Sequence, residues 1–177
     1  MRRTLYSFAT CLVLTAQSLA PYVPSPPEVV DRMLKLAAVT GADRVYDLGS
    51  GDGRIPIAAA RTYGARGVGI EIDPARVAEA RANAKAAGVE HLVEFRLEDV
   101  QTADVSEATV VMLYLLSSSN EKLRPILTRQ LKPGARVVSH AFSMGRSWPA
   151  DKVEQFTTAN GDEITLYLWR VDGRVRP

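Results

Sequence analysis

Three glycines alternate with other residues, beginning two positions after an acidic residue, in the segment Val-Tyr-Asp-Leu-Gly-Ser-Gly-Asp-Gly, residues 45–53. The apolar start of this segment predicts a buried strand that ends near Asp47. The turn that follows carries Gly49, Gly51 and Gly53, which let the backbone bend tightly and approach a ligand closely. Because open α/β sheets bind ligands beyond the carboxyl ends of their strands, the segment predicts a small polar ligand. An ordinary strand-to-helix turn is the structural alternative.

The spacing of these glycines differs from that of dinucleotide-binding sites. Such sites favour Gly-x-Gly-x-x-Gly, in which a pyrophosphate rests on the N-terminus of the next helix. Here the order is Asp47-x-Gly49-x-Gly51-x-Gly53. A carboxylate two residues before the first glycine repels a pyrophosphate but attracts an ammonium or a sulfonium group. The segment therefore favours a cationic ligand over a dinucleotide.

Two further acidic residues end predicted strands. Glu71 ends the second strand, roughly twenty residues after the glycines, where a carboxylate can accept both hydroxyls of a ribose. Asp73 competes for this role, but its place directly before Pro74 fits a helix cap better. Asp99 follows the third strand. A solvated carboxylate at Glu71 and an Asx-turn at Asp99 are the structural alternatives, yet three acidic residues at the ends of three successive strands are more specific together than singly.

Hydrophobic periodicity predicts the elements that would position these residues. A first helix begins near Pro27, where Ser25 and Glu28 have the spacing of a capping box. Strands are predicted at 44–48, 67–71, 91–97, 109–116 and 135–142, and further helices at 54–63, 75–87 and 120–131. Residues 153–158 and 163–171 flank Asn160-Gly161, a strong hairpin signal. The predicted fold is α/β and Rossmann-like: a doubly wound, mostly parallel sheet of seven strands that ends in an antiparallel hairpin, without the usual last helix.

The glycine motif and the three acidic residues resemble the class I S-adenosylmethionine-dependent methyltransferases. Segments 22–34, 113–116, 120–125 and 137–142 narrow the resemblance to small protein lysine methyltransferases, a group that includes the mitochondrial enzymes acting on the c subunit of ATP synthase and broad-specificity archaeal enzymes. The resemblance covers nearly all of residues 21–171. The serines at 117–119 depart from the pattern, at a place that borders the methyl-transfer site.

The resemblance assigns roles to the candidate residues. It implies that S-adenosylmethionine is bound by a set that includes the acidic residues and the glycines: Asp47, Gly49, Gly51, Gly53, Glu71, Asp99 and Val100. Asp99 would accept the adenine amino group, and Val100 would flank the adenine ring.

Three other residues are candidates for the acceptor side. Tyr114 would meet the transferred methyl group and orient the acceptor amine, although a tyrosine packed in the core is nearly as good an interpretation. Tyr22 and Ser25 would close over the cofactor or the incoming lysine; the alternative is that they only lead into the first helix and cap it. His140 lies within a buried strand pattern and is expected to be a core histidine.

The predicted activity is transfer of a methyl group from S-adenosylmethionine to a protein lysine side chain. A small-molecule N- or O-methyltransferase is the first alternative, and an exported binding module with a vestigial cofactor fold is the second. The fourth strand does not end in Asn-Pro-Pro-Tyr, which weakens a nucleic-acid or glutamine acceptor. No His, Asp or Glu cluster has the spacing of a metal site, so no metal is expected.

Length and composition indicate one domain. The chain has 177 residues, of which 46% are hydrophobic and 24% charged, as is usual for a globular protein. Its formal net charge is +2, but Arg2 and Arg3 lie in a segment, residues 1–20, that contains no Asp or Glu. The predicted domain, residues 21–177, therefore carries no net charge and is not built for non-specific binding to nucleic acid.

Residues 1–20 have the three parts of an export signal: a basic start, an apolar run at 8–16, and small residues before a cut after Ala20. The apolar run is shorter than the roughly 20 residues that span a bilayer. A cleaved signal would place the protein in the periplasm or outside the cell, whereas an uncleaved one would hold it at a membrane. Cys11 is the only cysteine, so the mature chain would have no disulfide, thiolate metal site or cysteine nucleophile.

Overall fold

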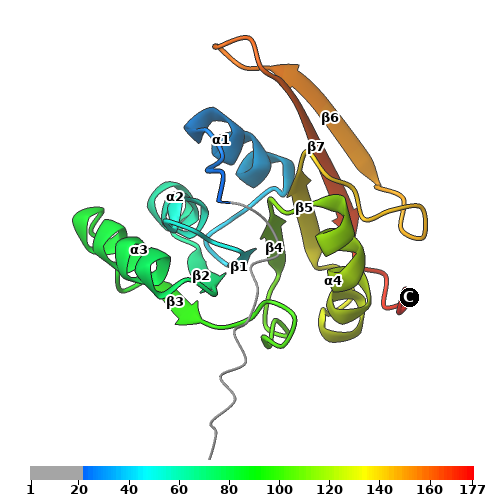
Figure 1. Ribbon diagram of the computed structural model, residues 1–177, viewed down its shortest axis with the longest axis horizontal. Helices are drawn as coiled ribbons and strands as arrows, with labels where there is room; N and C mark the ends of the chain where they lie inside the picture. The colour runs from blue at the N-terminus through cyan, green and yellow to red at the C-terminus, as the bar shows by residue number, and fades with distance from the viewer. Residues whose placement is uncertain (1–21) are drawn as a thin grey trace, which may run out of the picture.

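Seven strands form one sheet in the order β3-β2-β1-β4-β5-β7-β6 (Figure 1). The computed structural model describes residues 22–177, so the predicted signal or anchor at 1–20 lies outside the described residues. The first five strands pair in parallel, and β7 pairs antiparallel with both β5 and β6. The predicted methyltransferase-like sheet with a closing hairpin is therefore confirmed. The strands are β1 (Arg44–Leu48), β2 (Arg66–Glu71), β3 (Val93–Leu97), β4 (Val110–Leu113), β5 (Arg136–His140), β6 (Lys152–Thr157) and β7 (Glu163–Arg170).

Four helices cover the two faces of this sheet. On one face, α1 (Pro27–Leu36), α2 (Arg54–Tyr63) and α3 (Pro74–Ala86) pack side by side against the strands. On the other face, α4 (Ser117–Gln130) contributes Leu123 and Leu127 to a second layer of the core, which includes Trp169 of β7. Residues 100–108, which connect β3 to β4, complete this layer with small apolar side chains. Both faces are thus buried, as a doubly wound sheet requires.

The fourth strand is shorter than its apolar run predicts. All four residues of β4 are buried, but the strand ends at Leu113, and Tyr114 to Leu116 leave the sheet. The serines at 117–119 then form the first turn of α4, which begins three residues earlier than predicted. An apolar run marks burial rather than strand pairing, so it does not show where the sheet ends.

The predicted capping box at the start of α1 is wrong. The N-cap residue is Pro26, and no side chain caps this helix. Ser25 Oγ instead bonds to Nδ1 of His140 at 3.1 Å, and Glu28 Oε2 accepts a hydrogen bond from the N–H of Ala159 at 3.2 Å. Tertiary partners therefore replace the local bonds that the spacing predicts.

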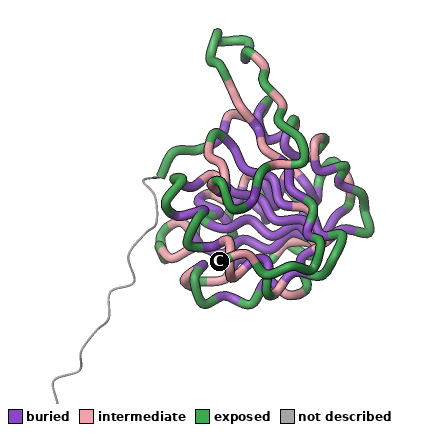
Figure 2. The backbone as a smooth tube through the Cα atoms, turned by 90° about the vertical axis from the view of Figure 1, so that its right-hand side faces the viewer, coloured by how far each residue is buried: buried purple, intermediate pink, exposed green. Residues whose placement is uncertain are grey.

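The hairpin of β6 and β7 projects beyond the buried strands, and its outer end is exposed (Figure 2). Gly161 in its turn has φ 90°, a left-handed conformation that favours glycine. The hairpin also contacts α1, because the Arg32 guanidinium lies 4.7 Å from the ring centroid of Phe156. Among residues 22–177, no helix is both long and apolar enough to cross a bilayer.

Candidate active site

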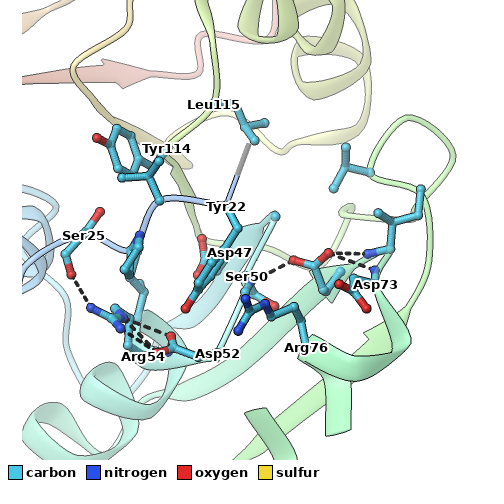
Figure 3. A pocket seen from close by; sticks show the side chains of 18 of the residues that line it. Tyr22, Ser25, Asp47, Ser50, Asp52, Arg54, Asp73, Arg76, Tyr114 and Leu115 are labelled. Carbon is cyan, nitrogen blue, oxygen red and sulfur yellow. Dashed lines mark hydrogen bonds and ion pairs between the residues drawn. The ribbon is translucent and has the colours of Figure 1, made fainter. Parts of the chain in front are cut away.

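A cavity of about 340 Å³ lies at the carboxyl ends of β1, β2 and β4 (Figure 3). The glycine turn after β1 and the segment that precedes α1 form much of its wall. Nine of the ten predicted site residues line it: Tyr22, Ser25, Asp47, Gly49, Gly51, Glu71, Asp99, Val100 and Tyr114. The tenth, Gly53, does not. Residues that are far apart in the sequence thus meet at the edge of the sheet where a ligand was predicted.

Gly51 and Gly53 both have positive φ, but the neighbours that leave no room for a side chain differ between the two positions. A Cβ atom on Gly51 would lie 2.5 Å from Cε2 of Tyr22, so this position lets the tyrosine ring cover the turn. A Cβ atom on Gly53 would lie 2.5 Å from Cζ of Phe95 and 2.9 Å from Cβ of Ala80. Gly53 therefore permits α2 to pack against β3 and α3, and this packing, rather than contact with a ligand, explains its place in the motif.

Asp47 is a buried acidic residue of the site, with only 3% of its surface exposed. Burial raises the pKa of its carboxyl group to about 8, and the negative charges of Glu71 and Asp52 contribute to this rise. A carboxylate in such a place is unstable alone and is stabilised by a cation. The electrostatics therefore favour a positively charged ligand, as the motif predicted.

Glu71 is held in place by three backbone amides. Its Oε2 accepts from the N–H of Gly51 at 2.9 Å, and its Oε1 accepts from the N–H groups of Ile72 at 2.8 Å and Asp73 at 3.0 Å. The carboxylate is thus fixed beside the glycine turn, where it can accept further hydrogen bonds from ligand hydroxyls. Asp73 caps α3 through the N–H of Ala75 at 2.8 Å, which confirms its predicted role as a cap.

Asp99 both forms an Asx-turn and lines the cavity, so its structural and its binding interpretation are compatible. Its Oδ1 accepts from the N–H of Gln101 at 2.9 Å, which makes an Asx-turn, and the same residue lines the cavity. The buried Val100 lies beside it in the cavity wall. The turn presents the Asp99 side chain to the cavity, so the structural role supports the binding role that the resemblance implies.

Ser50 is a cavity residue that the sequence did not single out. Its hydroxyl is buried and finds no hydrogen-bond partner among residues 22–177. Gly69 on the neighbouring strand leaves room for it, because a Cβ atom there would lie 2.5 Å from Ser50 Oγ. A buried polar group without a partner is costly. Ser50 is therefore a candidate to bond a ligand, and no sequence signal distinguishes it from other residues between glycines.

The residues at 22–26, which we call the strap, run across the cavity before α1 begins. Tyr22 is 43% exposed, and the Arg76 guanidinium lies 3.7 Å from the centroid of its ring. Arg54 Nη1 donates to the backbone carbonyl of Ser25 at 2.8 Å, while Arg54 Nη2 pairs with Asp52 at 2.6 Å. Figure 3 shows Ser25, Arg54 and Asp52 joined along one side of the cavity. Tyr22 and Ser25 thus both line the cavity, and their closing over the cofactor or the lysine stays a prediction.

Tyr114 forms the other end of the cavity. A histidine that does not itself line the cavity packs against Tyr114. The ring of Tyr114 stacks on His140 with centroids 3.9 Å apart, and the Phe142 centroid lies 6.4 Å away at a similar tilt. His140 is buried, as expected for a core residue, and burial lowers its pKa to about 4, so the ring is neutral at physiological pH. Its contacts with Tyr114 and Ser25 were not predicted. Its position at the end of a central strand is the signal that could have indicated them.

The charges around the cavity suit S-adenosylmethionine, which is cationic. Five acidic residues line the cavity, and the two arginines that line it are engaged with acidic partners. Asp47 would face positive charge, Glu71 would accept ribose hydroxyls, and Asp99 with Val100 would hold adenine. The acidic residues are Asp47, Asp52, Glu71, Asp73 and Asp99.

Comparison with known proteins identifies the family. The sequence profile of the ANTKMT methyltransferase domain matches residues 47–152. A protein-lysine N-methyltransferase of Saccharolobus islandicus is 45% identical over 150 residues, which cover 84% of this chain and 92% of that protein. The chain belongs to the ANTKMT methyltransferase family.

Two other relatives agree on the methyltransferase assignment but differ in the acceptor that they name. A lysine N-methyltransferase of Xenopus laevis, named for the c subunit of ATP synthase, is 35% identical over 152 residues, 84% of this chain and 66% of that protein. A solved structure from Salinibacter ruber is described as an RNA methyltransferase in complex with S-adenosyl-L-homocysteine. It is 60% identical, has a TM-score of 0.81, and covers 86% of this chain and 96% of its own.

The protein is an S-adenosylmethionine-dependent methyltransferase, which confirms the predicted family, activity and cofactor. S-adenosylmethionine supplies a methyl group that is already activated on a sulfonium sulfur, so the protein needs mainly to position the reactants and exclude water. In this methyltransferase the strap covers the cavity, and the glycine turn and Glu71 give it a fixed floor. Tyr114 supplies the wall at the opposite end.

Proposed function

We propose that this methyltransferase methylates the side-chain amine of lysine in a protein. The observation that carries the proposal is the similarity to the protein-lysine N-methyltransferase of Saccharolobus islandicus over nearly the whole length of both proteins. The lysine methyltransferase of Xenopus laevis supports it at lower identity.

The acceptor side of the cavity is suited to a neutral amine. A lysine with a pKa near 10.4 must lose its proton before it can attack, which costs about 4.6 kcal/mol at pH 7. Tyr114, its stacked partner His140 and Phe142 form an aromatic cluster without a carboxylate among them. An apolar wall disfavours the charged form of the amine and lowers its pKa. The Tyr114 hydroxyl would orient the neutral amine toward the methyl group.

An RNA acceptor is the alternative that the Salinibacter ruber structure raises. The cavity wall argues against it, because phosphates approaching the cavity would meet five acidic side chains and two arginines that are already paired. Nucleic-acid sites normally present unpaired basic residues. A small-molecule acceptor is the other alternative. The openness of the acceptor side suits a protruding lysine better than an enclosed metabolite, because no inserted domain covers the cavity among residues 22–177.

The experiment that tests the proposal is methyl transfer from labelled S-adenosylmethionine by the full chain. Three acceptor fractions of cells would be offered: proteins, RNA and small molecules. We expect label in the protein fraction that is recovered as methyllysine after acid hydrolysis. The control is the same protein fraction with its lysines acetylated, which should accept no label. Label found only in RNA or in small molecules would contradict a lysine acceptor.

We also propose that residues 1–20 direct export, with retention as an uncleaved membrane anchor as the alternative. The support is the three-part signal pattern in the sequence. N-terminal sequencing of the protein from cell fractions tests this. A soluble form that begins at Pro21 supports cleavage, a membrane-bound form that begins at Met1 supports the anchor, and a soluble form that begins at Met1 contradicts both.

A further inference from the structure

The strap is fastened on both sides of the cavity. On the side of the glycine turn, Arg76 lies against the Tyr22 ring at 3.7 Å, and Arg54 donates to the Ser25 carbonyl at 2.8 Å. On the side of Tyr114, the Ser25 hydroxyl and Nδ1 of His140 are hydrogen-bonded at 3.1 Å. Ser25 therefore connects the two sides through its backbone and its side chain.

His140 contacts the strap and the acceptor wall at the same time. Its Nδ1 bonds to Ser25 while its ring stacks on Tyr114 with 3.9 Å between centroids and 27° between planes. The backbone that carries this ring is held in place where the chain turns sharply after β5. Ala141 has φ 65°, its N–H donates to the Thr165 carbonyl at 2.8 Å, and the N–H of Phe142 donates back to the His140 carbonyl at 2.8 Å.

A histidine that only filled the core would contact other core side chains. The polar contact and the close stacking contact of His140 instead go to Ser25 and Tyr114, which both line the cavity. His140 is 3% exposed. A packed side chain cannot shift without displacing its neighbours. A movement of Ser25 would therefore displace the buried ring of His140 and, through it, the ring of Tyr114.

We infer that His140 is a positioning residue that couples the closed strap to the orientation of Tyr114 at the acceptor side. Closure of the strap over the cavity and alignment of the tyrosine ring are then one event. The coupling applies to any acceptor that Tyr114 orients. It rests on the proposed function only where that acceptor is taken to be a lysine amine.

Two substitutions separate the hydrogen bond from the stacking contact. Ser25→Ala removes the hydroxyl and leaves both rings in place, and His140→Phe keeps a stacked ring but removes Nδ1. Ser25→Thr restores a hydroxyl and serves as the conservative rescue. The matched controls are His91→Phe and Ser147→Ala, because both residues are exposed and do not line the cavity.

The first measurement needs no acceptor. The chain contains six tyrosines, so protein labelled with 3-fluorotyrosine gives six fluorine resonances, and Tyr22→Phe and Tyr114→Phe identify the two of interest. We expect Ser25→Ala to shift the Tyr22 and Tyr114 resonances together and to leave the other four unchanged, and Ser25→Thr to restore both. A Tyr114 resonance that stays unchanged in Ser25→Ala would overturn the coupling. If Ser25→Ala moves all six resonances, which would indicate a disturbed fold, His140→Phe carries the test through the Tyr22 resonance alone, because the new ring itself alters the resonance of the stacked Tyr114. A Tyr22 resonance that stays unchanged in His140→Phe would then overturn the coupling.

The second measurement is methyl transfer to whichever acceptor the wild type methylates. We expect Ser25→Ala and His140→Phe each to lower kcat about tenfold, the effect of one lost hydrogen bond. His140 does not line the cavity, so His140→Phe should change the Kd for S-adenosylhomocysteine less than about twofold. The double variant should be no slower than either single one, because both remove the same bond. Wild-type kcat in both variants would overturn the coupling and leave the proposed function intact. A wild type that methylates RNA or a small molecule, and no lysine, would overturn the proposed function and leave the coupling to be decided by the fluorine resonances.

Discussion

The carboxylate of Glu71 accepts a hydrogen bond from the N–H of Gly51 at 2.9 Å, so the end of β2 holds the glycine turn that follows β1. One side chain therefore shapes the turn and remains available to a ligand. The acidic residue is a structural part of the cavity floor before any cofactor binds.

Replacing Glu71 with alanine should impair binding and stability together. The N–H groups of Gly51, Ile72 and Asp73 would lose their acceptor, which we expect to lower the free energy of unfolding by about 1–3 kcal/mol. Binding of S-adenosylmethionine should weaken by about a hundredfold, because the ribose would lose its acceptor as well. Calorimetric titration and urea unfolding measure the two effects, with Glu90→Ala on the surface as the control. Binding that survives the change would show that Glu71 does not hold the ribose.

Replacing Asp47 with asparagine should stabilise the ligand-free protein at high pH. The folded pKa of Asp47 is about 8, above the ordinary value of 3.8, so the folded state binds the extra proton between these pH values. The contribution of Asp47 to the stability of the wild type therefore falls as the pH rises from about 4 to about 8. Asparagine has no proton to lose, so the variant should exceed the wild type by roughly 2–5 kcal/mol at pH 9 and match it near pH 4. Urea unfolding across this range measures the difference, and a variant that is less stable at pH 9 would contradict the assignment.

Binding of S-adenosylmethionine should release a proton from Asp47. A cation favours the ionised carboxylate, so affinity should rise with pH by up to about tenfold per unit and become constant above about pH 8. Calorimetry in two buffers with different enthalpies of ionisation counts the released proton. Asp47→Asn should bind weakly and show no such slope. An affinity in the wild type that does not depend on pH between about 6 and 8 would mean that Asp47 is already ionised in the free protein.

Alanine at Gly51 should mainly weaken cofactor binding, whereas alanine at Gly53 should mainly lower stability. Gly53→Ala places a Cβ atom against Phe95 and Ala80 in the core, and we expect a loss of about 2 kcal/mol or more of unfolding free energy. The atoms nearest to a Cβ at Gly51 belong to the ring of Tyr22, which can swing outward with the strap, so the left-handed backbone at φ 51° is the main cost to stability. We expect Gly51→Ala to weaken cofactor binding more than it lowers stability. Thermal unfolding and titration of both variants measure the contrast, and equal losses of stability would contradict it.

The sequence predicted the sheet and most of the cavity, because strand periodicity, glycine turns and acidic residues at strand ends are local features. The proximity of Asp47, Glu71 and Asp99 could be predicted once the strands were expected to be parallel, because the carboxyl ends of parallel strands meet at one edge of the sheet. The glycine motif did not reveal that Gly53 serves packing. The alanine and phenylalanine that it accommodates come from other elements.

The remaining errors and omissions concern partners that are distant in the sequence. Ser25 seemed to be a helix cap, but its hydroxyl bonds to a histidine 115 positions away. Local spacing cannot predict such a bond, because capping and tertiary contacts compete for the same hydroxyl. The same limitation hid Ser50, whose importance lies in the absence of a hydrogen-bond partner within residues 22–177.

The position of β6 at the end of the sheet has a consequence for how copies of this protein behave at high concentration. Its outer edge has backbone N–H and C=O groups that no other strand pairs with among residues 22–177, and such an edge can join a strand of another copy. The strand is six residues long and carries Lys152 and Glu154, whose charges disfavour that pairing. A short, charged strand at this place therefore makes edge-to-edge association of copies less favourable, an effect that is independent of methyl transfer.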